Sequence, residues 1–321
     1  MAPLLQVEDL RVDIPTPMGM LHAVRGLDLE LAQAETLCLV GESGCGKSLT
    51  ALALMALLPS NARRSARRLE FGGRDLLAAD ERQMSDLRGD RVAMIFQEPM
   101  TSLNPAYTVG DQLEEVLRRH RKAPRSQARE RALNLLEKVG ITAAASRMSQ
   151  YPHQLSGGLR QRVMIAMALM CGPDLIVADE PTTALDVTIQ AQILHLLKSL
   201  QQEFRMGLVL ITHDLGIVAR IADRVAVMYA GEVVESASAE DLFRAPRHPY
   251  TQGLLQCIPV PGRTRPGERL GAIPGLVPTP VGELTGCQFR NRCKHARPAC
   301  AGKILFSMKD QNHQVRCVLA A

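Results

Sequence analysis

Gly41-Glu42-Ser43-Gly44-Cys45-Gly46-Lys47-Ser48 is the stretch that decides the fold. It places four residues between a first glycine and a Gly-Lys-Ser triplet, which is the spacing of a phosphate-binding loop. The apolar residues 36–40 before it predict a buried strand, and residues 49–58 after it predict a helix that Pro59 ends. Strand, glycine loop and helix together predict a nucleotide site in an α/β fold.

The glycines of this loop let the backbone fold tightly around an anion. Successive N–H groups and the positive end of the helix dipole then point at the phosphates of a nucleotide. We expect Lys47 to hold the β- and γ-phosphates and the Ser48 hydroxyl to bind Mg²⁺. For this pattern alone, a glycine-rich turn that matches by chance is the alternative.

Length and composition suit a soluble protein of about two domains, with 321 residues of which 46% are hydrophobic. The longest apolar stretches, residues 51–58 and 163–171, are shorter than the ~18 residues that span a bilayer, so we expect no transmembrane segment. The amino terminus lacks a basic region followed by an apolar core, so we expect no secretion signal. A cytosolic location would keep the eight cysteines mostly reduced.

The charge and aromatic content argue against a nucleic-acid partner. The net charge is +5, aromatic residues make up 3% of the chain, and there is no Trp on which a base could stack. The basic residues 63–68 could contact phosphates, but a solvated loop is the favoured interpretation.

The pattern along the first half predicts an antiparallel sheet and a helical region. Apolar residues at 7, 10, 12 and 14 predict a strand-rich start, and apolar residues alternate with polar ones at 27–31. Together they predict an antiparallel sheet before the phosphate loop. Between residues 109 and 151 the apolar spacing changes to three and four, which predicts helices. We therefore expect a helical subdomain over about residues 98–160.

Polar residues follow the predicted strands of the parallel sheet. Gln97 follows the strand at 91–96, Asp179 and Glu180 end an apolar strand that begins at Leu175, and His213 follows residues 208–212. Strand ends hold ligand residues in such sheets, so we expect Asp179 to bind Mg²⁺ and Glu180 to orient or deprotonate an attacking water. His213 can reach the γ-phosphate. The alternatives are an acidic strand end without chemistry and a structural histidine.

A second candidate anion site is Ser156-Gly157-Gly158, which precedes the apolar helix predicted at residues 163–171. The free N–H groups and the positive dipole end at the start of that helix would again attract an anion. Taken alone the triplet is also a common turn.

The C-terminal tail, from about residue 236, is rich in proline, which excludes long helices and central strands. It contains four of the cysteines, namely Cys287, Cys293, Cys300 and Cys317. In a cytosolic protein such a cluster favours metal binding over disulfides. The paired spacing of zinc ribbons is absent, and thiolates also suit iron–sulfur clusters, so an iron–sulfur cluster, zinc and unliganded thiols all stay open.

Taken together, these motifs resemble those of the ATP-binding cassette ATPases, in family order over roughly residues 5–235. The phosphate loop resembles Walker A, Gln97 the Q-loop and residues 155–161 the signature motif. Residues 175–180 resemble Walker B, the stretch Ala184-Leu185-Asp186 the D-loop, and His213 the H-loop.

This resemblance implies a RecA-like P-loop NTPase domain with an antiparallel β-subdomain and a helical subdomain. It implies ATP and Mg²⁺ as ligands, with Ser48, Gln97 and Asp179 at the metal. It also implies a head-to-tail dimer in which Ser156, Gly157 and Gly158 close over ATP on the opposing subunit, near the D-loop Asp186. The usual aromatic partner of adenine is replaced by aliphatic residues, Ile14 or Val24.

A narrower resemblance covers the whole chain. Residues 94–105, 178–188 and 246–251 resemble the bacterial dipeptide, oligopeptide and nickel importer ATPases, on the dipeptide side. This implies an ATPase domain at 1–235, a family-specific extension at 236–321, and in some members a four-iron cluster in that tail. It also implies a paralogous second ATPase, two permeases and, indirectly, an extracytoplasmic binding protein, with the chain at the cytoplasmic face of the inner membrane. A nickel or metal-chelate importer and a soluble cassette protein acting on nucleic acid or ribosomes are the alternatives.

Overall fold

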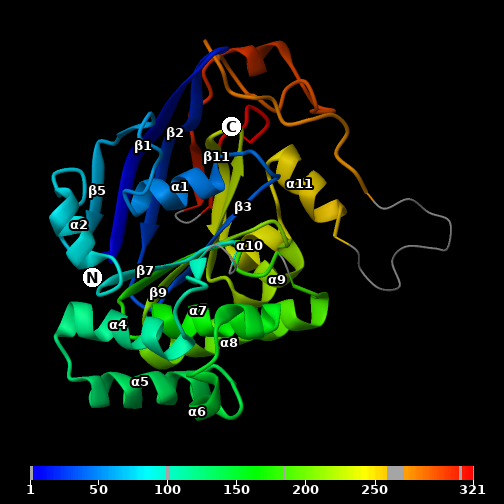
Figure 1. Ribbon diagram of the computed structural model, residues 1–321. Coiled ribbons are helices and arrows are strands. Elements are labelled where there is room, and N and C mark those ends of the chain that lie inside the picture. The colour runs from blue at the N-terminus through cyan, green and yellow to red at the C-terminus, as the bar shows by residue number, and fades with distance from the viewer. Residues whose placement is uncertain (1–2, 99–101, 184, 259–270, 311–312, 321) are drawn as a thin grey trace, which may run out of the picture.

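The fold contains two β-sheets and a separate group of helices, as the computed structural model shows (Figure 1). The structure describes residues 3–98, 102–183, 185–258, 271–310 and 313–320. The masked positions include Pro99–Thr101 of the segment after Gln97 and Ala184 of the predicted D-loop, so these two parts of the prediction lie outside the described residues.

The larger sheet has the order β12-β13-β11-β10-β3-β9-β8-β7. Its parallel strands are β7 (Val92–Ile95), β8 (Leu175–Asp179), β9 (Gly207–Thr212), β3 (Thr36–Val40) and β10 (Arg224–Tyr229). Its antiparallel strands are β11 (Glu232–Ser238), β13 (His313–Val315) and β12 (Ser307–Asp310). Every residue of β3, β8 and β9 is buried, which is why these strands read as continuous apolar runs.

The smaller sheet is antiparallel, and its first two strands precede the phosphate loop, as predicted. Its strands are β1 (Leu5–Thr16), β2 (Gly19–Leu31), β4 (Arg63–Ser65), β5 (Arg68–Phe71) and β6 (Arg74–Asp75). Strand β4 and the start of β5 lie within residues 63–68 and pair with β1, so the predicted loop is wrong. The predicted exposure to solvent holds for Arg63, Ser65, Arg67 and Arg68. Arg64 is half-buried and donates to the carbonyl of Ala53 at 2.7 Å, near the end of the helix that precedes it.

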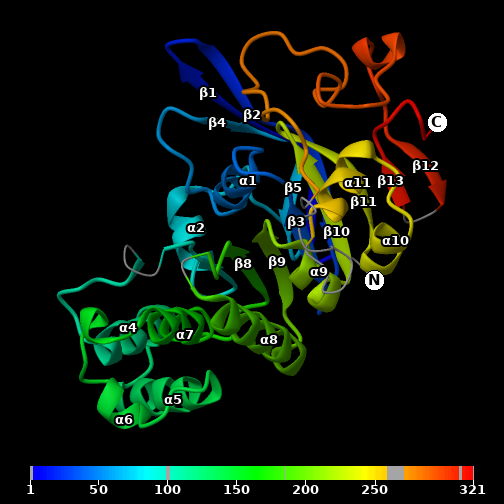
Figure 2. The same cartoon turned by 90° about the vertical axis from the view of Figure 1, so that its right-hand side faces the viewer.

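The helices of the predicted helical region lie together below the larger sheet, in the same part of the molecule as α8 (Figures 1 and 2). The predicted helical region contains α4 (Val109–Arg121), α5 (Arg125–Lys138), α6 (Ala144–Arg147), η1 (Pro152–Gln154) and α7 (Gly157–Ala168). The other helices of the ATPase part are α1 (Lys47–Leu54), α2 (Glu81–Leu87), α8 (Val187–Phe204) and α9 (Leu215–Ile221). The helical subdomain is therefore present.

Two helix boundaries differ from prediction. The helix α1 ends at Leu54 rather than residue 58, because Ala56 takes the left-handed conformation with φ +51°, which stops a helix before Pro59 is reached. The helix α7 starts at Gly157 rather than residue 163, because the Ser156 side chain caps it.

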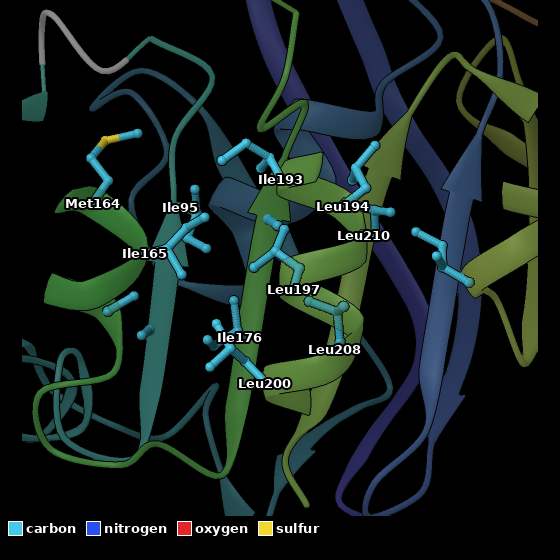
Figure 3. Close-up of a cluster of buried hydrophobic side chains, with 14 of the residues drawn as sticks. Ile95, Met164, Ile165, Ile176, Ile193, Leu194, Leu197, Leu200, Leu208 and Leu210 are labelled. Carbon is cyan, nitrogen blue, oxygen red and sulfur yellow. The ribbon is translucent and has the colours of Figure 1, made fainter. Parts of the chain in front are cut away.

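The main core lies between the larger sheet and the helix α8 (Figure 3). Ile193, Leu194, Leu197 and Leu200 of α8 face the strands, and each is at most 2% exposed. Ile176 of β8 meets this helix face and is fully buried. This packing fixes the strand ends on which the site is built.

The C-terminal tail is built into the fold more closely than its proline content predicts. It contains α10 (Ala239–Arg244), α11 (Pro249–Gln256) and η2 (Pro298–Ala301), and its strands β12 and β13 extend the larger sheet. Tyr250 and Phe289 are buried in the main core. The predicted division at 235/236 falls inside β11. No helix in the described part of the chain is long and apolar enough to cross a membrane.

Candidate functional site

The phosphate loop is held close to neighbouring backbone at two of its glycines. Gly41 has φ +153° and Gly46 φ +103°, both in the region that favours glycine. A Cβ at Gly41 would lie 2.2 Å from the carbonyl oxygen of Met228, and one at Gly46 would lie 2.3 Å from that of Ala23. Glycine is therefore required at both positions, whereas Ser43 and Gly44 are exposed at the tip of the loop.

Lys47 lies under this loop and is 4% exposed. Its Nζ donates to the carbonyl oxygens of Gly41 at 2.8 Å and Glu42 at 2.9 Å, and lies 3.7 Å from the Sγ of Cys45. The structure therefore places the ammonium group at the centre of the loop, where the predicted phosphate ligand would meet it.

Ser48 and Asp179 come together from the first turn of α1 and the end of β8. The Ser48 hydroxyl donates to Asp179 Oδ1 at 3.0 Å. Burial raises the pKa of the Asp179 carboxyl, and the adjacent Glu180 adds to this shift. A hydroxyl and a desolvated carboxylate are ligands that suit Mg²⁺, whose charge would compensate the burial of Asp179.

Glu180 accepts contacts from the ends of two neighbouring strands. Its Oε2 lies 2.7 Å from the Thr183 hydroxyl, 3.4 Å from Gln97 Nε2 and 3.4 Å from His213 Nδ1. Gln97 follows β7 and His213 follows β9, and these strands flank β8 in the sheet. Glu180 itself has φ +44°, a strained conformation for a non-glycine residue that is typical of functional sites.

Gln97 and His213, predicted at the ends of separate strands, are thus brought to the carboxylate of Glu180. Thr183, which holds that carboxylate, is a residue whose role the sequence analysis missed. Its position three residues after Glu180 is the spacing of a local turn contact and could have indicated it.

The signature residues lie against the start of α8. Ser156 and Gly157 are exposed, and the Ser156 hydroxyl accepts from the amide of Leu159 at 3.4 Å. A Cβ at Gly158 would lie 3.1 Å from Ile189. Asp186 caps α8 by accepting from the amide of Ile189 at 3.0 Å. The structure therefore brings the signature and D-loop residues together within one chain.

The two adenine candidates differ in accessibility. Val24 is fully buried, whereas Ile14 is half-buried and packs at the edge of the smaller sheet's core. Ile14 is therefore the candidate whose apolar side chain is accessible to an adenine ring, and its contact with adenine stays a prediction.

The four tail cysteines line one small cavity of about 10 Å³, together with His248 and His295. The donor set suits a thiolate-bound metal, but this space holds about one water molecule, so a cluster would require the thiols to move apart. No group of three or more His, Cys, Asp or Glu side chains in the described ranges is arranged to hold a metal ion. Burial raises the pKa of the Cys287 thiol to about 11.

Two residues of the C-terminal part contact the phosphate loop and were missed. Arg292 forms an ion pair with the Glu42 carboxylate, and the Glu42 amide donates to the Tyr250 hydroxyl. They are separated from Glu42 by 250 and 208 residues, so no local pattern in one sequence could indicate either contact.

Comparisons with known proteins agree with the motif order. A family model described as ABC transporter matches residues 24–183, and one described as oligopeptide/dipeptide transporter, C-terminal region matches residues 234–300. The dipeptide transport ATP-binding protein DppD of Escherichia coli (strain K12) is 49% identical over 315 residues, covering 98% of this chain and 96% of the relative. DppD of Bacillus subtilis (strain 168) is 47% identical over 324 residues, covering 99% and 95%.

Solved structures agree as well. The ATP-binding cassette MJ0796, in a dimeric post-hydrolysis state bound to ADP and Pi, matches with a TM-score of 0.66 and 26% identity over 73% of this chain and 98% of that one. The cbiO1 protein from Clostridium perfringens matches with a TM-score of 0.65 and 26% identity over 76% and 92%. Identity near one half along almost the whole length confirms the resemblance: the chain belongs to the ATP-binding cassette family, as an ATPase of the group that carries the oligopeptide/dipeptide transporter C-terminal region.

Proposed function

We propose that this chain binds Mg·ATP at residues 41–48 and hydrolyses it to drive the import of dipeptides or oligopeptides through partner permeases. The observation that carries the proposal is the convergence of Gln97, Glu180 and His213 at three adjacent strand ends. The names of the relatives, which are dipeptide and oligopeptide transport ATP-binding proteins, support peptides as the cargo.

The residues around the phosphate loop have separate roles in binding the phosphates and the Mg²⁺. Lys47 neutralises the β- and γ-phosphates, and loop amides bind the remaining phosphate oxygens. Ser48 and Asp179, joined at 3.0 Å, would hold the Mg²⁺ together with Gln97. The ion would supply positive charge that offsets the charge developing on the phosphates.

Glu180 deprotonates or orients the attacking water. Thr183 keeps its carboxylate in place through the 2.7 Å hydrogen bond, and Gln97 and His213 approach the same oxygen from either side. His213 is 57% exposed at its side chain, which leaves it free to turn toward the γ-phosphate.

The other wall of the site comes from a second ATPase subunit in a head-to-tail dimer. Ser156 and Gly157 are exposed at the N-terminal end of α7, as a cap offered to a neighbouring subunit requires. Asp186, beside this cap, completes the contact between subunits. The matching cassette MJ0796 was solved as a dimer, which supports this arrangement.

We place the assembly at the cytoplasmic face of the bacterial inner membrane. Two permeases would bind the ATPase pair through the segment after Gln97, and an extracytoplasmic binding protein would deliver the peptide. The ATPase part at 1–235 would hydrolyse ATP, and the extension at 236–321 would stabilise its phosphate loop.

The cargo is tested by uptake in cells that carry either the parental chain or Lys47→Ala. We expect uptake of labelled dipeptide to be lost in the variant, because the permeases cannot alternate without ATP. Longer peptides and Ni²⁺ serve as the competing cargoes. Dipeptide uptake that is unchanged by Lys47→Ala, with Ni²⁺ uptake lost, would contradict peptide import and favour the nickel alternative.

We further propose that Cys287, Cys293, Cys300 and Cys317 hold a four-iron cluster. Support comes from their lining one cavity although they span 31 positions of the chain; the thiols would have to move apart to admit the cluster. We expect anaerobically purified protein to contain about four iron and four sulfide per chain. Cys300→Ser should lose both, and Cys257→Ser, outside the group, should keep them. Colourless parental protein without iron and sulfide would contradict this proposal.

A further inference from the structure

The Glu42 side chain of the phosphate loop is held by a residue from the far end of the chain. Arg292 Nη1 donates to Glu42 Oε2 at 2.7 Å and Nη2 to Oε1 at 2.9 Å. Both terminal nitrogens of the guanidinium bind the carboxylate, each to one oxygen. This bidentate form of an arginine–carboxylate pair is strong and fixes the orientation of both groups. The phosphate loop is therefore fastened to the C-terminal part.

Arg292 is itself fixed on every side, and its side chain is 5% exposed. The guanidinium lies over the rings of Tyr229 and Phe289, at 5.8 and 5.9 Å from their centroids. It also donates to the carbonyl oxygens of Ile273 at 3.1 Å and Pro274 at 2.8 Å. These contacts leave the guanidinium one orientation, with its fork toward Glu42.

The backbone of the same glutamate is held separately. The Glu42 amide donates to the hydroxyl of Tyr250 at 2.9 Å, and Tyr250 of α11 is fully buried. The rings of Tyr250 and Tyr229 pack edge to face at 4.6 Å. Main chain and side chain of one loop residue are thus both fixed by a single aromatic and cationic cluster, formed by Tyr229, Tyr250, Phe289 and Arg292.

We propose that Arg292 is a positioning residue of the ATP site, which neutralises Glu42 and fixes the first turn of the phosphate loop for triphosphate binding. The inference rests on the proposed ATP site. Its physical basis is charge: an unpaired carboxylate on this loop would repel the phosphates, and a partly buried one is screened poorly by solvent. The C-terminal extension thereby contributes directly to nucleotide affinity.

The test is equilibrium binding of a fluorescent ATP analogue with Mg²⁺ to the purified full-length chain. We expect Arg292→Ala to weaken binding about tenfold, because the unpaired Glu42 carboxylate would repel the phosphates through a poorly screening environment. The double variant Glu42→Gln/Arg292→Ala should recover most of this loss, because no unpaired carboxylate remains. In the assembled transporter Arg292→Ala should raise KM for ATP and leave kcat nearly unchanged.

Arg290→Ala is the matched control, since Arg290 lies in the same turn and donates to the carbonyl of Thr285 rather than to the loop. If Arg292→Ala unfolds below the assay temperature, Arg292→Lys replaces it, with binding about threefold weaker because an ammonium cannot form the fork. Parental affinity in Arg292→Ala or Arg292→Lys would overturn the inference. So would a double variant Glu42→Gln/Arg292→Ala that binds no better than Arg292→Ala. Failure of the parental chain and Arg290→Ala to bind Mg·ATP would instead overturn the proposed function.

Discussion

Replacing Glu180 with glutamine should reduce ATP turnover about 10²- to 10⁴-fold while ATP binding is retained, because that is the usual contribution of a general base. The amide keeps the shape of the side chain and its contact with the Thr183 hydroxyl, which lies 2.7 Å from the carboxylate. It cannot accept the proton of water. The loss therefore falls on kcat, with KM for ATP nearly unchanged.

The measurement is phosphate release by the purified transporter, with binding of the nucleotide followed in parallel. Glu203→Gln is the matched control, since Glu203 is a carboxylate at the end of α8 that pairs with Lys138 on the surface. We expect this control to keep parental turnover. Parental turnover in Glu180→Gln would show that another group activates the water.

Replacing Lys47 with alanine should weaken binding of Mg·ATP about ten- to a hundredfold, since each hydrogen bond to a charged group contributes about 1.5–3 kcal/mol. The ammonium is 4% exposed and lies within 3 Å of two loop carbonyls. Arg292, which also contacts this loop, is bound to the Glu42 carboxylate and does not replace the ammonium. Both the affinity for Mg·ATP and the turnover at a given ATP concentration should therefore fall, whereas Glu180→Gln should keep its affinity.

Binding by calorimetry tests this prediction, with Lys138→Ala as the matched control, because it removes a lysine from the surface of α5. Thermal melts of both variants separate loss of affinity from loss of fold. A Lys47→Ala chain that melts like the parent and binds Mg·ATP equally well would contradict the assignment of the loop.

Local patterns predicted the parts of this protein that are local. The strand and loop at residues 36–48 depend on neighbouring residues, and so do the strand ends at Gln97, Asp179 and His213. Their meeting at one point could be predicted because the carboxyl ends of parallel strands share one edge of a sheet. The helical subdomain was also predicted from a local pattern, the spacing of its apolar residues by three and four.

The errors concern contacts between distant segments. Residues 63–68 were expected to form a loop, because the pairing of β4 with β1 depends on residues some fifty positions earlier. The C-terminal strands β13 and β12 join the larger sheet at its edge through β11, a pairing that the proline pattern, which excluded only long helices and central strands, could not predict. The pair between Glu42 and Arg292 is the clearest case. It joins the phosphate loop to a turn 250 residues later in the chain, and no repeating pattern in the sequence relates the two segments.

The account depends most on a triphosphate bound between the loop at 41–48 of this chain and the signature residues of a neighbouring subunit. The direct measurement is an experimental structure of the assembled transporter carrying Glu180→Gln, determined with Mg·ATP. We predict the γ-phosphate beside Lys47, Mg²⁺ beside Ser48 and Asp179, and a serine-glycine cap from the second ATPase over the nucleotide. Nucleotide bound elsewhere, or this loop closed by residues of its own chain, would contradict the account.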